Sequence, residues 1–191
     1  TRAHAKYFSE ELGADPEKMQ VMYLEADTSI YYPHQIEKPE PAKGKYTVLY
    51  FGSILPLQGV DIVLEAAERL KDRTDICFYI IGPIGEKMTK PSGPNIHYIQ
   101  WLSQDKLSDY IAFSDLCLAG HFNREINKAK RTIPGKAYIY RAMEKPMILG
   151  ENPANHELYS EKEPGISFVE MGSGKKLAEK ILECRDRWSR R

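Results

Sequence analysis

The stretch from Val48 to Leu70, VLYFGSILPLQGVDIVLEAAERL, has the pattern of a buried strand, a glycine-containing turn and an amphipathic helix. Apolar residues recur at helical spacing in its second half and would form one buried stripe: Val60, Val63, Leu64, Ala67 and Leu70. Turns of this kind often hold a phosphate on backbone N–H groups. This turn contains no Lys or Arg, so the positive charge of any phosphate site must come from elsewhere.

The same alternation continues to the end of the chain. Short apolar segments predict strands at 46–51, 75–82, 95–100, 115–120, 146–150 and 165–170. Amphipathic segments predict helices at 59–72, 103–114, 135–143, 153–159 and 172–188. Such short apolar strands are typical of a parallel sheet covered by helices on both faces. Residues 45–191 are therefore predicted to form a doubly wound α/β domain with a six-stranded, mostly parallel sheet.

Residues 1–44 have a different character. Residues 2–12 predict a short helix that ends at Gly13, and residues 18–24 are a strand candidate. Residues 25–44 contain several prolines and no helical periodicity, which is typical of a linker or extended arm. Since the chain begins at Thr1 without Met, we expect residues 1–44 to be the end of an N-terminal domain, otherwise absent, plus a linker.

Composition narrows the function. The chain has 191 residues, with 27 Lys plus Arg against 27 Asp plus Glu, and this balance argues against nucleic acid as a partner. No apolar run approaches the roughly 18 residues of a membrane span. The cysteines Cys77, Cys117 and Cys184 form no CxxC pair, so we interpret them as reduced thiols of a cytoplasmic protein.

In the strand order 3-2-1-4-5-6, ligands bind outside the carboxyl ends of strands one and four. The loop after strand four, residues 120–136, carries five basic side chains and one acidic side chain, Glu125. It ends at Pro134, whose position predicts the start of a helix. We predict that Lys130, Arg131 and Lys136, with the N–H groups of Gly135 and Lys136, bind an anion such as a diphosphate. A solvated loop without a ligand is the alternative.

Other candidates lie at the same predicted edge. The turn after strand one lacks the spacings GxGxxG and GxxxxGK[ST], but Gly52 offers close backbone approach and Ser53 a hydroxyl group. Trp101 could stack on a nucleobase or cap the core. Glu151 and Asn152 could reach sugar hydroxyl groups. His121 could bond a sugar or phosphate, or be a surface residue. We expect no metal, because no Asp-x-Asp, HExxH or clustered Cys/His set occurs.

Several segments, in order, resemble the C-terminal nucleotide-sugar-binding domain of group 1 (family 4) retaining glycosyltransferases of the GT-B fold. GSILPLQGVDIVLEAA is similar to the family pattern G-R-L-x-x-x-K-G-x-x-x-L-x-A-A. NIHYIQWLSQDKLSDYIAFSDLCL resembles its strand, helix and "A-D" strand. TIPGKAYIYRAMEKPMILGENPANHEL is similar to a variant I-P-N-K-x-x-E-x-x-A-x-G-K-P-V-I followed by E-L. The resemblance covers nearly the whole chain.

The resemblance implies a Rossmann-like donor domain that binds a nucleoside diphosphate sugar, while an N-terminal domain binds the acceptor. It also shows departures. The family's diphosphate-binding Arg and Lys fall at Ser53 and Gln58, and its acidic pair falls at Arg131 and Ile139. We therefore expect the loop after strand four to hold the diphosphate, with little help from the turn. Catalytic residues stay unassigned.

Three functions remain open at this point. The first is a hexosyl- or other glycosyltransferase whose donor-binding half is inactive alone, because half a cleft cannot orient the acceptor. The second is a catalytically silent nucleotide-binding or scaffold module, and the third is a nucleotide-sugar epimerase of similar fold. The basic tail RDRWSRR, residues 185–191, is either a helix end or a peripheral contact with an anionic membrane in the full-length protein.

Overall fold

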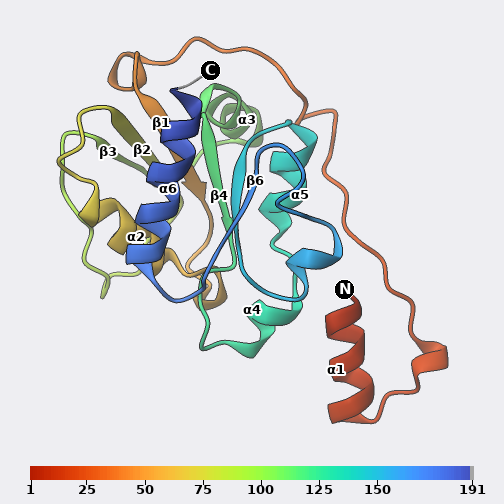
Figure 1. Ribbon diagram of the computed structural model, residues 1–191. Coiled ribbons are helices and arrows are strands. Elements are labelled where there is room, and N and C mark those ends of the chain that lie inside the picture. Colours follow the sequence, from red (N-terminus) through yellow and green to blue (C-terminus); the bar gives the residue numbers. More distant parts are fainter. Residues whose placement is uncertain (190–191) are drawn as a thin grey trace.

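A computed structural model describes residues 1–189. Six parallel strands form one sheet in the predicted order β3-β2-β1-β4-β5-β6 (Figure 1). The strands are β1 (Tyr46–Phe51), β2 (Ile76–Ile81), β3 (Ile96–Ile99), β4 (Leu116–Gly120), β5 (Met147–Gly150) and β6 (Ile166–Val169). The helices are α1 (Arg2–Leu12), α2 (Val60–Arg69), α3 (Gln104–Phe113), α4 (Asn127–Arg131), α5 (Gly135–Ala142) and α6 (Gly174–Trp188). The predicted doubly wound α/β fold is thereby confirmed.

The two faces of the sheet carry separate cores. Alternate residues of a strand point to opposite faces, so Val48 and Tyr50 join one core while Leu49 joins the other. The first core is closed by α2 and α6, which lie side by side across the sheet (Figure 1). The second core is closed mainly by α3 and α5. Burial on both faces explains why the strand segments are almost wholly apolar.

The N-terminal segment is tied to the domain by a few specific contacts. Helix α1 ends at Gly13 in a left-handed conformation, φ 68°, as predicted. At its other end, the Glu157 carboxylate accepts hydrogen bonds from the N–H groups of Arg2 (2.7 Å) and Ala3 (2.8 Å). The Tyr23 hydroxyl donates to the same carboxylate at 2.7 Å. Glu157 thus supplies the negative charge that a helix N-terminus attracts.

The arm between α1 and β1 runs around the outside of the domain, as a linker should (Figure 1). Tyr31 is buried on the arm, and Ser108 of α3 donates to the carbonyl of Ile30 at 2.8 Å. Lys38 forms an ion pair with Asp115. These three contacts fasten an extended segment that has little regular structure of its own.

Two predicted elements are absent from the structure, and several short helical segments were not predicted. Residues 18–24 form no strand and have no partner in the six-stranded sheet. Residues 153–159 contain only a 3-10 turn, Asn155–Glu157, because side chains bond the backbone there instead of helical carbonyls. Asn152 Oδ1 accepts from the N–H of Asn155 at 2.8 Å. Helix α4, unforeseen, interrupts the loop after β4, and other 3-10 turns are Pro16–Lys18, Glu40–Ala42 and Pro56–Gln58.

The C-terminal tail continues α6 as a helix end. Trp188 is partly exposed, and its ring lies 5.5 Å from the ring of Tyr46, while Lys38 Nζ lies 5.7 Å from it. These contacts favour the interpretation of the tail as a helix packed on the start of β1. Residues 190 and 191, part of the tail for which a membrane contact was the alternative, lie outside the described residues.

Candidate functional site

A cleft of about 410 Å³ opens at the carboxyl ends of β1, β2, β3 and β4. We refer to it as the cleft. It is bounded by the turn after β1, by residues 81–83 and 100–102, by His121 and by residues 134–136 at the start of α5. It lies where the strand order reverses between β1 and β4, the position predicted from the sequence. Gly52, Ser53, Trp101, Gly135 and Lys136 line it together.

The floor of the cleft is main chain. Gly52 donates its N–H to the carbonyl of Ile81 at 3.0 Å, and Gly82 donates to the carbonyl of Ile99 at 2.8 Å. Gly82 has a φ of +116°, and a Cβ atom there would lie 1.9 Å from the carbonyl oxygen of Gly52. Only glycine fits at Gly82. The resulting floor lets a ligand approach the ends of β1 and β2 closely.

Lys136 is the basic residue of the loop after β4 that enters the cleft. Its side chain is 6% exposed, and its Nζ lies 4.1 Å from the ring centroid of Tyr50. Nζ donates a hydrogen bond to Gln58 Oε1 at 2.9 Å. Burial lowers the pKa of Lys136 from 10.5 to about 7. The cleft therefore holds an amine that an incoming anion would readily convert to its charged form.

Gln58 connects this amine to the turn after β1. Its Oε1 also accepts from the Tyr50 hydroxyl at 3.1 Å, and its Nε2 donates to Ser53 Oγ at 3.1 Å. Three side-chain contacts thus fix the amide in one orientation. Gly59 ends this turn at φ +72°, and a Cβ atom there would lie 2.8 Å from the backbone nitrogen of Asn123. Close packing of the turn on the segment after β4 brings Gln58 to Lys136.

His121 is a second titratable group of the cleft. Its side chain is 7% exposed, and its Nδ1 is buried without a hydrogen-bond partner among the described residues. Burial, and after it the charges of Lys136 and Lys128, lower the pKa of His121 to about 4. His121 is thus neutral at pH 7 and offers one ring nitrogen as donor and the other as acceptor. The interpretation of His121 as a surface residue is wrong.

The start of α5 adds donors to the same wall. Pro134 precedes the helix, and no side chain caps its first turn. A Cβ atom at Gly135 would meet nothing within 4 Å. The N–H groups of Gly135 and Lys136 are among those that a helix cannot satisfy internally, and they carry the positive end of the helix dipole. An anion in the cleft can use both.

Trp101 stands at the rim. Its side chain is 77% exposed and lines the cleft, which excludes the alternative that it caps the core. An exposed indole at the mouth of a cleft offers a flat surface to a planar ring. Since its burial in the free protein is slight, the residue contributes little to the packing of the domain.

The remaining predicted site residues do not line the cleft. Lys130 is exposed on α4, whose buried residue is Ala129. The guanidinium carbon of Arg131 lies 3.5 Å from the ring centroid of Tyr7 on α1. Asn152 is 3% exposed and bonds neighbouring backbone groups. The predicted concentration of basic charge is therefore dispersed: α4 turns Lys130 to solvent and Arg131 to α1.

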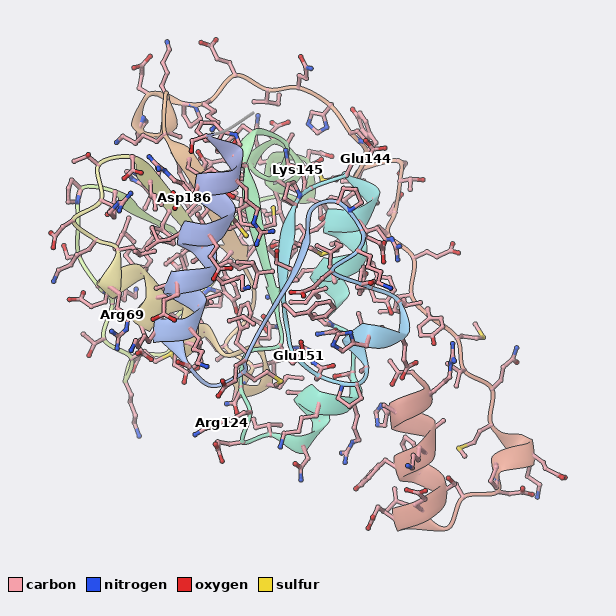
Figure 2. The ribbon with its side chains drawn as sticks, in the orientation of Figure 1. Arg69, Arg124, Glu144, Lys145, Glu151 and Asp186 are labelled. Carbon is pink, nitrogen blue, oxygen red and sulfur yellow. The ribbon has the colours of Figure 1, made fainter. Side chains whose placement is uncertain are left out.

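Glu151 follows β5 at the carboxyl edge of the sheet but does not line the cleft. Figure 2 shows it at the same end of the domain as Arg124. It is exposed and pairs with His156, and Arg124 pairs with Glu125 at 3.0 Å. Ile139, at a position of the family's acidic pair, packs partly buried against the second core. None of these residues lines the cleft.

Sequence reasoning missed the role of Gln58 in this site. The signal was available, because Gln58 occupies the position of a diphosphate-binding Lys in the resembling family. Because the Gln58 side chain is neutral, the sequence alone did not indicate that it contacts a basic group of the cleft. No group of three or more His, Cys, Asp or Glu side chains within residues 1–189 is arranged to hold a metal ion. The three cysteines are free thiols.

The family described as "Glycosyl transferases group 1" matches residues 45–186. The match covers the whole sheet and the cleft, and the chain belongs to this family. No curated protein sequence matches the chain. No helix within residues 1–189 is both long and apolar enough to cross a membrane.

Solved structures share the fold. The C-terminal domain of a glycosyl transferase group 1 family protein (LpcC) from Francisella tularensis aligns with a TM-score of 0.62 at 19% identity, over 84% of this chain and 88% of that one. HepE from Anabaena, in complex with UDP-glucose, aligns with a TM-score of 0.73 at 15% identity over 99% of this chain. Sucrose-phosphate synthase from Thermosynechococcus elongatus gives a TM-score of 0.72 at 12% identity over 97% of this chain.

The chain spans 53% of the HepE chain and 48% of the synthase chain, so it corresponds to about half of each. At these identities the likeness establishes the fold of the domain. The UDP-glucose complex is a property of HepE.

Proposed function

We propose that this chain is the donor-binding half of a glycosyltransferase and that its cleft binds a nucleoside diphosphate sugar. One observation carries the proposal: Lys136 is a buried amine, 6% exposed, at the strand-order reversal of a group 1 glycosyltransferase domain. Within residues 1–189, the hydrogen-bond partner of its Nζ is the neutral Gln58 amide, at 2.9 Å. A buried amine is costly unless something compensates its charge, and a diphosphate would do so.

The donor would lie across the cleft. Its diphosphate would meet Lys136 and the first-turn N–H groups of α5, and Ser53 Oγ could donate from the opposite wall. Its base would stack on Trp101 at the rim. His121 would offer a neutral hydrogen bond to a phosphate or sugar oxygen. HepE, which shares the fold, is known in complex with UDP and with UDP-glucose, which supports uridine nucleotides as first probes.

In sugar transfer the bond from the sugar to the diphosphate breaks, and negative charge grows on the leaving phosphate. Groups already aimed at that charge lower the barrier without reorganising. Lys136 and the α5 N-terminus are the groups that this chain offers, and no metal is proposed. The acceptor would come from a second domain, so the chain alone would bind a donor without transferring its sugar. A cytoplasmic location is proposed with it, since all three cysteines are free thiols.

Titration calorimetry tests the binding. A charge-assisted phosphate contact contributes about 1.5–3 kcal/mol, so Lys136→Met should weaken UDP or GDP binding by roughly ten- to a hundredfold. Lys130→Met is the matched control, because Lys130 is exposed and outside the cleft. Its affinity should stay within about twofold of the unaltered chain. Equal affinities for all three proteins would refute the placement of the phosphate.

The scaffold module is the second candidate, and two residues favour it. Arg131 and Ile139 stand at the positions of the resembling family's acidic pair, and neither side chain has a carboxylate for a sugar. Arg131 lies against Tyr7, and Ile139 packs against the second core. Absence of binding to UDP, GDP and their glucose and mannose esters would move this candidate ahead. Sugar transfer by the full-length protein, lost on Lys136→Met, would exclude it.

A further inference from the structure

The electrostatic surroundings of Lys136 contain no counter-charge. No carboxylate is among the residues that line the cleft within residues 1–189. The titratable groups around it are Tyr50 from β1, His121 after β4 and Tyr140 from α5. Asp61 on α2 and Lys128 on α4 are exposed charges farther out. Lys136 therefore faces phenols, a neutral imidazole and an amide.

The free site consequently favours the uncharged amine. Burial lowers the pKa of Lys136 to about 7, although Nζ has a hydrogen bond to one amide oxygen and lies 4.1 Å from the centroid of the Tyr50 ring. At pH 8 most molecules would carry a neutral Lys136. A diphosphate diester has about two negative charges, and an opposite charge within a few ångströms favours protonation of an amine. Binding would reverse the preference.

We propose that the cleft takes up one proton, at Lys136 Nζ, when a nucleoside diphosphate sugar binds; this rests on the proposed function. The proton comes from solvent or buffer, and no covalent bond of the donor changes in this step. The amine becomes an ammonium that donates to the diphosphate while keeping its bond to Gln58 Oε1. Binding of the donor thus produces both the positive charge on Lys136 and its contact with the diphosphate.

His121 stays neutral in this scheme. Its pKa is about 4 in the free protein, through burial and then through the charges of Lys136 and Lys128. A fully charged Lys136 opposes a second positive charge nearby. The uptake is therefore assigned to one group, and substitution of His121 should leave it in place.

The linkage has a definite sign. Binding raises the pKa of Lys136, so affinity is greatest below the free-state pKa and falls as the pH rises above it. From about pH 7 up to the pKa of the bound state, affinity should fall about tenfold per pH unit, the slope for one proton. Proton uptake should be close to one per donor at pH 8 and close to zero at pH 6.

UDP-glucose is the suitable probe, because both its phosphates are esterified. UDP has a terminal phosphate that itself titrates near pH 6, which would obscure the signal. Calorimetry of the 191-residue chain in pairs of buffers with different ionisation enthalpies gives the number of protons taken up at each pH. The expected result is uptake in the unaltered chain and in His121→Gln, and none in Lys136→Arg, whose guanidinium stays charged.

The outcomes separate the two proposals. Binding of UDP-glucose without proton uptake between pH 6 and 9 overturns the inference and leaves donor binding intact. Uptake per bound UDP-glucose that persists in Lys136→Arg, or that disappears in His121→Gln while UDP-glucose still binds, overturns the assignment to Lys136. If Lys136→Arg does not fold, the pH dependence of the unaltered chain and of His121→Gln decides alone. No binding of UDP-glucose at any pH removes the inference together with the proposed function.

Discussion

Gln58 Oε1 and Lys136 Nζ meet at 2.9 Å across the cleft, joining the turn after β1 to the first turn of α5. This contact explains why the turn can lack Lys and Arg. The basic group reaches the turn from the opposite wall, and the turn supplies the amide that holds it. A neutral turn and a phosphate site are therefore compatible in this domain.

Lys136→Met should stabilise the free protein while weakening donor binding. The pKa of Lys136 falls from 10.5 when unfolded to about 7 when folded, which costs on the order of 4 kcal/mol of folding free energy at neutral pH. Between these pH values the unfolded chain holds one proton more, so the free energy of unfolding rises with pH. Urea denaturation from pH 6 to 10 should show this rise in the unaltered chain relative to Lys136→Met. Parallel pH profiles would contradict the buried, neutral amine.

Gln58→Glu should abolish most donor binding at nearly unchanged volume. The new carboxylate would lie against Lys136 Nζ and would satisfy its charge, so that a diphosphate would meet an occupied amine and a repelling anion. We expect at least roughly tenfold weaker UDP-glucose binding, the loss of one charge-assisted contact. Gln104→Glu on the exposed start of α3 is the control. Unchanged affinity in Gln58→Glu would mean that the diphosphate does not use Lys136.

Gly52→Ala should disturb the site through one methyl group. Its Cβ would lie 2.1 Å from Gln58 Oε1 and 3.0 Å from Lys136 Nζ, so the amide has to leave its place. We expect UDP affinity to fall about tenfold or more, as measured by calorimetry. Gly85→Ala is the matched control, since its Cβ would meet only Met88 Cγ, at 4.0 Å. If both variants bind UDP with the same affinity, the Gln58 amide is not needed for UDP binding.

Trp101→Ala should lower affinity for nucleotides but not for inorganic diphosphate. Stacking of a base on an aromatic side chain contributes about 1–3 kcal/mol, and inorganic diphosphate has no base. The side chain is 77% exposed, so unfolding should be unaffected within about 0.5 kcal/mol. Competition titrations with UDP and diphosphate measure both ligands on one sample. Equal losses for the two would place the base away from Trp101.

Glu157→Gln should release α1 without unfolding the sheet. Burial tends to raise the pKa of Glu157, but hydrogen bonds from Ala3, Arg2 and Tyr23 outweigh it and leave that pKa lowered. The contact is therefore present at neutral pH and is lost as the pH falls through the folded-state pKa.

Hydrogen exchange of residues 2–12 should accelerate in Glu157→Gln, while exchange in β1 and β4 stays slow. Glu125→Gln is the control, because the Glu125 side chain is exposed and pairs with the neighbouring Arg124, away from α1. Protection of α1 that is unchanged in Glu157→Gln would show that its other contacts, such as that of Arg131 with Tyr7, hold the helix in place.

Sheet and site differ in how far the sequence determines them. A short apolar run indicates each strand, and the order of the strands in the sheet is the common one for parallel sheets of this kind. The position of the cleft was therefore predictable. Segment 18–24 has the composition of a strand, but a strand also needs a neighbouring strand to pair with. The local sequence does not show whether such a neighbour exists. Residues 153–159 have a helix-like pattern, but the side chains of Asn152 and Asn155 bond backbone groups of this loop instead. The sequence pattern does not reveal these bonds.

Side-chain direction was the harder part of the site. Lys130, Arg131 and Lys136 look equivalent as basic residues of one loop, yet α4 and α5 send them to solvent, to Tyr7 and into the cleft. That separation depends on the boundary between two short helices. His121 shows the same limit, because its burial depends on the packing of the turn after β1 on the segment after β4.

The main-chain floor at Gly52 and Gly82 determines where this cleft is open to evolutionary change. A Cβ atom at Gly82 would collide with the Gly52 carbonyl, so that position tolerates no side chain, and a Cβ atom at Gly52 would displace the Gln58 amide that contacts Lys136. Exposed residues that line the cleft, such as Ser53 and Trp101, can change without disturbing this floor. A library that redirects this domain to another donor would accordingly vary the rim and leave both glycines untouched.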